Sequence, residues 1–241
     1  FIHHVENSKK KPQAVIISYP CNPTTQIADI SFYEEIVSFC RKHQIYIISD
    51  IAYCELYFDE KSKPNSVLEV KNADDIAIEF SSVSKSYSLA GTRVGFAVGN
   101  KNLISALYKI KSYLDYGSFT PLQMVSASAL SKKSDDYLVN LRKLYHQRGE
   151  YFVKKFHDEL GWKIEKPKAS MFVWAKIPPQ FSHLNSFDFC KKLILETGVA
   201  MSPGSSFGAN GEGFVRFSMI RNNHEVDEAI LRLKRIFILK F

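Results

Sequence analysis

The sequence lacks the features of a metalloprotein, a disulfide-rich protein or a membrane protein. Its 241 residues include only four cysteines, which form no Cys-x-x-Cys pair and no metal-like cluster: Cys21, Cys40, Cys54 and Cys190. Reduced thiols and no bound metal are therefore predicted. No apolar run reaches the ~18–20 residues of a membrane span, and residues 1–7 lack a basic start followed by an apolar signal core. These absences predict a cytoplasmic protein with no membrane partner.

The positive charge of the chain is also not concentrated anywhere. Lys and Arg total 32 against 25 Asp and Glu, which gives a net charge of +7. The short basic runs, at Lys9–Lys11, Lys132–Lys133 and Lys191–Lys192, lie far apart in the sequence. A nucleic-acid surface would gather such residues, so no nucleic-acid partner is expected. The lysines are interpreted as side chains on solvated faces, where their charge gives the protein some attraction for anionic substrates.

What the sequence does contain is an α/β pattern in its first half. Residues 14–19 form an apolar run that predicts a parallel strand, and residues 45–50 predict a second one. Between them, residues 30–41 have a helical period, with Ser31 as the expected N-cap and Glu34 at the capping-box position. Strand, helix and strand together form a βαβ unit, in which the loops at the carboxyl ends of the strands bind ligands.

The second half changes character. Long helical periods come first, over 102–114, 121–130 and 135–160, the last ended by Gly161 as the C′ residue. The remainder alternates strands and helices, which predicts a small α+β domain. Its expected strands cover 162–165, 170–175 and 214–219, and its expected helices cover 187–197 and 225–239.

One lysine stands out between these halves. Residues 76–80 and 94–98 predict two buried strands, and Lys85 lies in the connection between them. A partly desolvated lysine close to other cations can act as the amine nucleophile that forms a Schiff base. Hydroxyl and guanidinium donors suited to a phosphate are its neighbours in sequence: Ser82, Ser84 and Arg93. The combination predicts pyridoxal phosphate, against the alternative of an ordinary solvated loop lysine.

Three earlier residues fit the same cofactor. Asp50 ends an apolar strand, where its carboxylate can pair with a pyridinium nitrogen or simply cap the following loop. Tyr53 follows three residues later and can reach the phenolic oxygen of the same ligand. Asn22 precedes a proline, a common turn sequence, and can equally donate to that oxygen. Each of these residues therefore has a structural and a functional interpretation.

Taken in order, the motifs resemble those of the class I/II, fold-type I pyridoxal-phosphate aminotransferases. The motifs are Asn22-Pro23-Thr24, Asp50-x-x-Tyr53, Ser82-x-Ser84-Lys85, Arg93 and a late Arg216. The resemblance implies that Lys85 forms the Schiff base, Asp50 pairs with the pyridine nitrogen, and Asn22 and Tyr53 contact the ring oxygen. It also implies that Ser82 and Arg93 bind the phosphate. Arg216 would clamp the substrate carboxylate, and Asn22 is the other residue expected to bind substrate.

The resemblance extends from about Ala14 to the C-terminus and is closest to the alanine and LL-diaminopimelate aminotransferase branch. Residues 111–117, 165–174 and 202–204 carry this likeness. It implies a mainly parallel sheet flanked by helices, with residues 1–150 as part of the large cofactor-binding domain and 151–241 as the C-terminal small domain. A homodimer is also implied. One departure is Thr25, where many relatives have glycine.

The expected reaction is transamination between an amino acid, first alanine, and a 2-oxo acid such as 2-oxoglutarate. LL-diaminopimelate is the second expected amino donor, and the rival is a pyridoxal-phosphate β-lyase or decarboxylase of the same fold. The chain starts without methionine, and the resemblance covers only the C-terminal part of the longer family members. We therefore also expect a C-terminal portion that is inactive alone, because the N-terminal phosphate-binding helix start and ring-stacking aromatic are missing from it.

Overall fold

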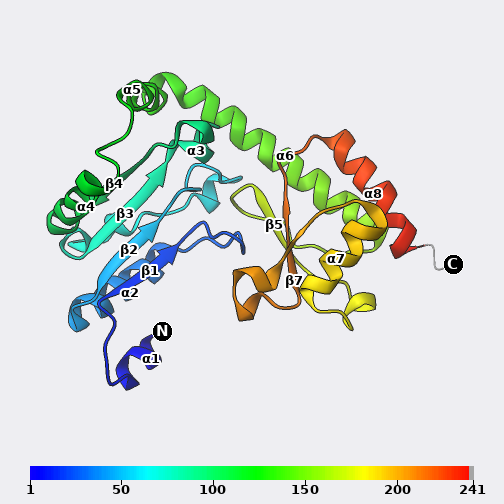
Figure 1. Cartoon of the computed structure of the whole chain (residues 1–241), viewed down its shortest axis with the longest axis horizontal. Helices are drawn as coiled ribbons and strands as arrows, with labels where there is room; N and C mark the ends of the chain where they lie inside the picture. Colours follow the sequence, from blue (N-terminus) through cyan, green and yellow to red (C-terminus); the bar gives the residue numbers. More distant parts are fainter. Residues whose placement is uncertain (239–241) are drawn as a thin grey trace. The chain divides into compact units, whose positions relative to one another are not determined.

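The computed structural model describes residues 1–238, apart from the side chain of His4. The chain forms two compact units. The first unit contains residues 1–20 and 27–141, and the second contains residues 21–26 and those from 142 onward. Helix α6 (Asp135–Leu160) contributes residues to both (Figure 1). The assignment of 1–150 and 151–241 to the large and small domains of the family stays a prediction.

The first unit is built on a four-stranded, mainly parallel sheet. Its strands are β1 (Ala14–Ser18), β2 (Tyr46–Asp50), β3 (Ala77–Ser82) and β4 (Gly95–Gly99), in the order β1-β2-β3-β4 (Figure 1). The first three are parallel, and β4 runs antiparallel to β3. This sheet confirms the predicted α/β fold class of the first unit.

Helix α2 (Ile30–His43) packs its apolar stripe against this sheet. The stripe and the facing strand residues form one core, which includes Tyr33, Ile36, Val37, Cys40, Ile45 and Ile47. The predicted N-cap was wrong by two residues. Asp29 is the N-cap, since its Oδ1 accepts from the Phe32 backbone N–H at 2.9 Å, while Ser31 Oγ donates to the same carboxylate at 2.8 Å. Ser31 thus supports the cap from within the first turn.

The other helices of the first unit are α1 (Ile2–Asn7), α3 (Val83–Ser86), α4 (Lys101–Leu114) and α5 (Thr120–Ala129). Helices α4 and α5 match the predicted spans within a residue at each end. The sequence did not predict α1 or α3, because a helix of one or two turns is too short to show an apolar period. Within residues 1–238, no helix combines the length and apolar character needed to cross a membrane.

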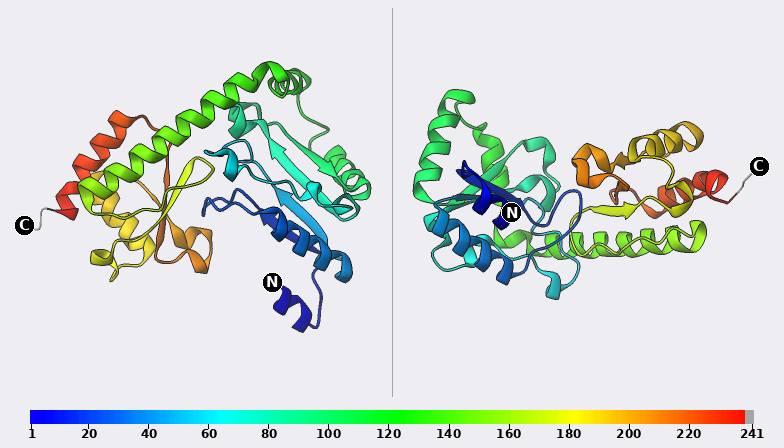
Figure 2. Two further views of the ribbon diagram at one scale, coloured as in Figure 1. Left: turned by 180° about the vertical axis from the view of Figure 1, so that it is seen from behind. Right: turned by 90° about the horizontal axis from the view of Figure 1, so that it is seen from below.

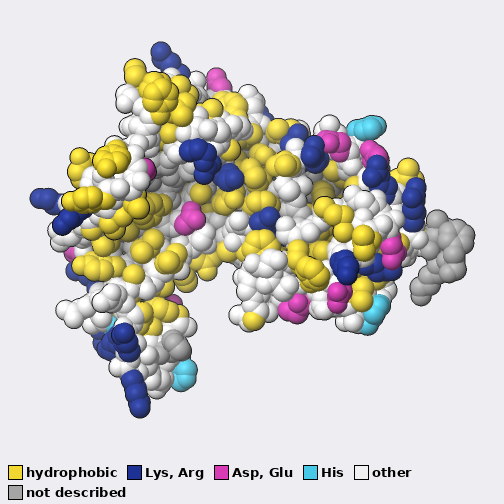
Figure 3. All heavy atoms as spheres, viewed as in Figure 1, with side chains coloured by type: hydrophobic (Ala, Val, Ile, Leu, Met, Phe, Trp, Pro, Cys, Tyr) yellow, Lys and Arg dark blue, Asp and Glu magenta, His cyan; other side chains and the backbone are white. Residues whose placement is uncertain are grey.

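Strand β4 is less buried than predicted. It forms an edge of the sheet, and Phe96 and Val98 are 40% and 48% exposed. A short apolar run does not reveal whether a strand is central or at an edge, so the expected burial was wrong. Exposed apolar side chains also gather over α4 and α5 (Figure 3), among them Tyr108, Tyr113, Leu114, Tyr116, Phe119 and Met124. Exposed apolar side chains that gather in this way are typical of interaction faces.

The second unit is the predicted α+β arrangement. Its antiparallel sheet has the order β5-β7-β6, with β5 (Phe172–Lys176), β7 (Phe214–Ser218) and the two-residue β6 (Ser202–Pro203). Helix α7 (Ser186–Thr197) contacts β6 and β7 of this sheet, and helix α8 (Asn223–Phe237) contacts α7; two further views show the ribbon (Figure 2). Both helices were predicted, although the expected end at residue 239 lies outside the described residues.

Helix α6 covers Asp135–Leu160, the predicted span. Gly161 follows at φ +65°, a left-handed conformation that costs glycine little, and its N–H donates to His157 O at 3.0 Å. The chain then enters an aromatic core in which Trp162 lies edge-on to Phe217 at 5.2 Å. The predicted strand over 162–165 was wrong. Trp162 and Ile164 are buried on alternate positions, which imitates a strand pattern, but residues 162–165 are not part of a strand.

Candidate active site

The turn that carries Lys85 is fixed by its own serines. Ser82 ends β3 and is the N-cap of α3, with its Oγ accepting from the Ser84 backbone N–H at 3.1 Å. The same Oγ lies 2.9 Å from Ser84 Oγ and 2.9 Å from the carbonyl oxygen of Val94. These contacts hold the strand-to-helix turn in one conformation. Lys85 is therefore presented from a rigid base, although α3 has only four residues.

The Lys85 side chain lies beside Tyr53. Its Nζ is 6.0 Å from the centroid of the Tyr53 ring, and the tyrosine is only 8% exposed. A cation near an aromatic face is attracted to it electrostatically. Lys85 itself is half-buried, so the alternative of a fully solvated loop lysine does not describe it. The structure thus brings together two predicted site residues that the sequence separates by a strand.

Arg93 lies at the same end of the β3–β4 pair as Ser82. The two strands align Ser82 with Gly95, and the contact between Ser82 and Val94 continues this alignment toward Arg93. Arg93 has φ +54°, and its Nη1 donates to the carbonyl oxygen of Ala90 at 2.8 Å. Ser82, Ser84 and Arg93 thus belong to adjoining segments near the end of β3. This set of donors fits a phosphate group.

Asp50 is the last residue of β2, aligned with Ser18 and Phe80 of the neighbouring strands. Its carboxylate is exposed, and Oδ1 accepts from the Ala52 backbone N–H at 3.0 Å. The structural role that the sequence left open, capping of the following loop, is therefore present. An exposed carboxylate at a strand end also stays within reach of a ligand. Both interpretations of Asp50 are compatible with its position.

Cys54 is a neighbour of this site that the sequence did not single out. It follows Tyr53 directly, and burial, followed by repulsion from Glu55, raises the pKa of its thiol to about 12. At neutral pH the thiol is protonated and is a weak nucleophile. It therefore does not compete with the Lys85 amine for an aldehyde. Its position next to Tyr53 was the only signal in the sequence.

In the second unit, Arg216 occupies the middle of β7. Its Nη1 donates to Asn22 Oδ1 at 2.6 Å, and its Nη2 donates to Ser202 Oγ at 3.3 Å. Its Cζ also lies 4.2 Å from the ring centroid of Phe172 and 4.7 Å from that of Phe207. The guanidinium is thus held at its edge by two oxygens and against two aromatic rings. The structure brings Asn22 and Arg216 together, 194 residues apart in the chain.

Asn22 reaches Arg216 from a closed loop. Cys21 N–H donates to Gln26 O at 2.9 Å, and Thr25 N–H donates to Cys21 O at 2.8 Å. Thr25 is buried at φ +61°, in the left-handed region that glycine adopts freely and β-branched residues avoid. The glycine expected at this position in many relatives suits the same backbone. Thr25 therefore holds a conformation at this turn that a glycine would also adopt.

The predicted residues divide between the units. Asp50, Tyr53, Ser82, Ser84, Lys85 and Arg93 belong to the first unit, and Asn22 and Arg216 belong to the second. Sequence reasoning missed Ser202, Phe172 and Phe207 as partners of Arg216. The sequence held one signal for Phe172. It lies two residues before Trp174 on β5, so the two side chains are on the same face of the sheet, and Trp174 is aligned with Arg216. Trp174 and Ser202 are the residues aligned with Arg216 on the flanking strands.

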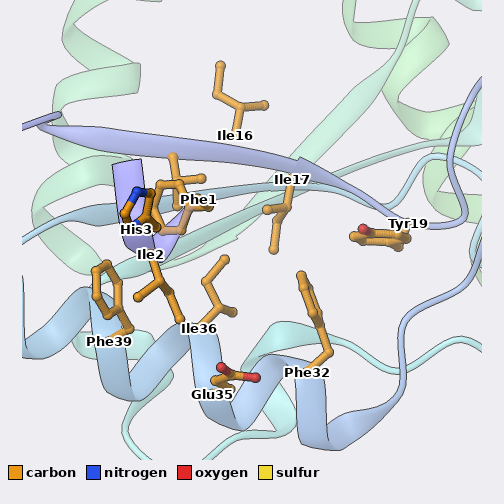
Figure 4. Close-up of a pocket in the computed structure, with 11 residues that line it drawn as sticks. Phe1, Ile2, His3, Ile16, Ile17, Tyr19, Phe32, Glu35, Ile36 and Phe39 are labelled. Carbon is orange, nitrogen blue, oxygen red and sulfur yellow. The ribbon is translucent and has the colours of Figure 1, made fainter. Parts of the chain in front are cut away.

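A separate apolar pocket of about 590 Å³ lies in the first unit between α1, β1 and α2 (Figure 4). Phe1, Ile17, Phe32 and Ile36 are among the side chains that line it, with Glu35 at its edge. None of the predicted site residues belongs to this lining. The pocket is therefore distinct from the candidate site. Among the described residues, no group of three or more His, Cys, Asp or Glu side chains is arranged to hold a metal ion.

The comparisons with known proteins agree on one family. Residues 2–233 match the family model described as aminotransferase class I and II. The chain is 45% identical over 231 residues to the putative aminotransferase AatC of Rhizobium meliloti, covering 96% of this chain and 56% of the relative. It is 42% identical over 234 residues to the glutamate-pyruvate aminotransferase AlaC of Escherichia coli, covering 97% and 56%. It is 40% identical over 231 residues to an LL-diaminopimelate aminotransferase of Nitratidesulfovibrio vulgaris, covering 96% and 58%.

Solved structures give the same result. Substrate-bound BacF from Bacillus subtilis superimposes with a TM-score of 0.90 at 36% identity, over 96% of this chain and 57% of that one. An aromatic aminotransferase from Pyrococcus horikoshii gives 0.88 at 29% identity, over 96% and 61%. The chain spans little more than half the length of the curated relatives it matches. The expected fold-type I architecture is confirmed, and pyridoxal phosphate is the cofactor of the family. This chain belongs to the class I and II aminotransferases.

Proposed function

We propose that this chain is the C-terminal portion of an enzyme that carries out pyridoxal-phosphate-dependent transfer of an amino group between an amino acid and a 2-oxo acid. The observation that carries the proposal is the setting of Lys85, a half-buried amine on a turn fixed by Ser82, beside the buried ring of Tyr53. The donor set around that turn fits the cofactor phosphate. Membership of the aminotransferase family supports the same activity.

Four parts of the cofactor have proposed partners in the chain: its aldehyde carbon, ring nitrogen, ring oxygen and phosphate. The Lys85 amine binds the aldehyde carbon, and the Asp50 carboxylate keeps the ring nitrogen protonated. Tyr53 and Asn22 contact the ring oxygen, and the phosphate is bound by Ser82, Ser84 and Arg93. When bound, the cofactor withdraws electrons from the substrate α-carbon and makes its proton acidic. The protonated thiol of Cys54 leaves Lys85 as the nucleophile of this segment.

Lys85 has a second proposed role after the substrate amine takes its place. The freed amine removes the α-proton of the substrate and later returns a proton, acting first as a base and then as an acid. Tyr53 limits the directions in which the amine can move, because the ring lies 6.0 Å from Nζ. The rigid turn at Ser82 keeps the amine at one position through both steps.

Arg216 is the proposed clamp for the substrate α-carboxylate. Its planar fork can donate two parallel hydrogen bonds to a carboxylate, which a lysine cannot do. Asn22 and Ser202 fix the rotation of the guanidinium before the substrate arrives. Such preorganisation reduces the entropy that binding has to offset. The same clamp serves amino acids and 2-oxo acids, because both carry the carboxylate.

For the substrates, we propose alanine with 2-oxoglutarate first, and LL-diaminopimelate as the second amino donor. The similarity to a glutamate-pyruvate aminotransferase supports the first, and the similarity to LL-diaminopimelate aminotransferases supports the second. The rival β-lyase reaction gives a different product, because a lyase releases ammonia. A transaminase passes the nitrogen to the oxo acid, so recovery of the amino group as glutamate separates the two.

A cytoplasmic homodimer is the proposed form of the protein. The apolar surface over α4 and α5 supports a partner on that face, since exposed patches of this kind are typical of interfaces (Figure 3). Light scattering of the complete gene product at increasing concentration tests the dimer.

The test of the proposed function is Lys85→Ala in the complete gene product. We expect the absorption of bound cofactor in the visible region to disappear and turnover to fall by at least about 10⁴-fold, since both the covalent link and the proton transfer are lost. Lys85→Arg should not rescue activity, because a guanidinium is not a nucleophile at neutral pH. Lys109→Ala, which removes an exposed lysine from α4, is the matched control. Near-normal transamination by Lys85→Ala, or an inactive wild-type protein, would contradict the proposal.

A further inference from the structure

We propose that Phe207 is a positioning residue for Arg216, whose ring fixes the plane of the guanidinium so that substrate carboxylates meet it edge-on. The inference rests on the proposed role of Arg216 as the carboxylate clamp. Phe207 closes the 3₁₀ turn Gly204–Phe207 that directly follows β6. Its ring centroid lies 4.7 Å from the Cζ of Arg216, although the two residues are on different elements of the second unit.

Two rings approach the guanidinium from the two sides of β7 in the sheet. Phe172 lies on β5, which pairs with one edge of β7, and Phe207 follows β6, which pairs with the other. Their centroids are 4.2 Å and 4.7 Å from the same Cζ. Phe172 is buried, and Phe207 is 36% exposed. Phe207 is therefore the more accessible of the two rings and the one that can be exchanged with less damage to the core.

The ring of Phe207 is itself held in place. It meets the ring of Trp174 edge-on, with centroids 5.9 Å apart and planes at 85°. Trp174 in turn stacks on Phe214, with centroids 5.2 Å apart and planes at 7°. Trp174 is also the residue of β5 aligned with Arg216. The edge-on contact with Trp174 thus fixes Phe207 relative to the strand that carries the clamp.

This arrangement limits how an anion can reach Arg216. A guanidinium is attracted to the face of an aromatic ring, and its N–H donors all point outward in its own plane. With rings against it, the group is open to a carboxylate only at its edge, which is the geometry of a bidentate pair. The bonds from Nη1 to Asn22 and from Nη2 to Ser202 fix the remaining rotation within that plane. Removing the Phe207 ring allows the plane to tilt.

The effect of such tilting has a specific signature. Every amino acid and 2-oxo acid presents the same α-carboxylate, so the loss of positioning weakens the binding of all these substrates by a similar factor. A residue that contacted the substrate side chain would instead change one substrate more than another. A residue that only supported the fold would lower the melting temperature and would not separate KM from kcat. The proposed role therefore differs measurably from both alternatives.

The experiment compares Phe207→Leu, Phe207→Tyr and Phe214→Leu in the complete gene product loaded with cofactor. Phe214→Leu is the matched control, because its ring stacks on the same tryptophan while Phe207 is the one placed against Arg216. For Phe207→Leu we expect KM to rise by about 5- to 30-fold for alanine and for 2-oxoglutarate alike, with kcat changed by less than about threefold. Phe207→Tyr should restore KM, and Phe214→Leu should change it by less than about twofold.

A double-mutant cycle separates this inference from the proposed function. In an Arg216→Lys background, Phe207→Leu should have no further effect, because the group it positions is gone. If Arg216→Lys leaves KM unchanged, the proposed clamp fails. If Arg216→Lys raises KM while Phe207→Leu does not, or raises it for one substrate only, the positioning role is overturned and the clamp stands. Should Phe207→Leu lower the melting temperature by many degrees, Phe207→Met, which keeps apolar volume without a ring, replaces it with the same expected result.

Discussion

A buried carboxylate on β3, the strand that leads into the turn of Lys85, allows a stability prediction to be worked out in detail. Glu79 lies on β3 and is only 4% exposed. It accepts hydrogen bonds from Ser66 Oγ at 2.6 Å, from Val67 N–H at 3.2 Å and from Ser49 Oγ at 3.3 Å. Ser66 and Val67 begin the 3₁₀ turn over residues 67–69, so Glu79 ties that turn to the sheet. The substitution considered is Glu79→Ala.

The loss of stability on Glu79→Ala follows from the three donors that lose their acceptor, Ser49, Ser66 and Val67. A hydrogen bond to a charged acceptor contributes about 1.5–3 kcal/mol, and the two longer bonds belong at the low end of that range. Removing a buried carboxylate also removes its desolvation penalty, which offsets part of the loss. We therefore expect Glu79→Ala to lower the free energy of unfolding by about 2–4 kcal/mol. Glu79→Gln should cost only about 1 kcal/mol, because its Oε1 can accept from Val67 and its amide can donate to Ser66.

The assay is urea unfolding followed by circular dichroism, with the midpoint and the slope fitted for each variant. The matched control is Glu69→Ala, which removes from the same turn a carboxylate that accepts from the Ser66 backbone N–H at 2.7 Å. Its loss should cost about 1 kcal/mol or less, as for other capping interactions. A Glu79→Ala protein within about 1 kcal/mol of the wild type would refute the reasoning.

Three further predictions concern the clamp, the thiols and the acid limit of stability. Arg216→Lys should raise KM for amino acids by about tenfold or more through the lost second hydrogen bond, while the absorption of bound cofactor stays intact; loss of both together would mark a structural role. In iodoacetamide mapping by mass spectrometry at pH 8, Cys21 should react well before Cys54, whose thiol pKa burial raises to about 12; equal rates would contradict this. The hydrogen bond from Tyr151 lowers the pKa of Asp227 in the folded protein below its ordinary value of 3.8. The contact therefore stabilises the fold at pH values above 3.8, and this stabilisation is lost as the pH falls through the lowered pKa of the folded protein. Asp227→Asn should therefore make the melting temperature less dependent on pH below about 4, and a pH dependence equal to that of the wild type would argue against this role.

The secondary structure was predictable where a local pattern decided it. The apolar period of α6 is long enough to give both of its ends, and Gly161 supplies the left-handed residue that stops it. The pattern failed where burial depends on distant partners. Residues 162–165 alternate in burial because Trp162 enters an aromatic core, whereas Phe96 and Val98 of β4 stay 40% and 48% exposed, because the burial of a strand depends on what covers its faces.

The site residues also divide into those that a local sequence pattern reveals and those that only the folded chain brings together. The hydroxyls near Lys85 could be found in the sequence because Ser82 and Ser84 belong to one turn, and Arg93 lies two residues before the paired strand β4. The surroundings of Arg216 could not be found, since Asn22 and Phe207 reach it only through the folded chain. Cys54 was overlooked because its thiol matters through burial, which a single sequence position does not reveal.

The central claim, that Lys85 is the residue that binds the cofactor covalently, is tested most directly by chemical fixation. The complete gene product is incubated with pyridoxal phosphate, reduced with borohydride, digested, and mapped by mass spectrometry. The proposal predicts that the mass of the reduced cofactor is found on the peptide that contains Lys85 and is absent from the Lys85→Ala protein. Comparable labelling of another lysine such as Lys109, or retention of the label by Lys85→Ala, would contradict it.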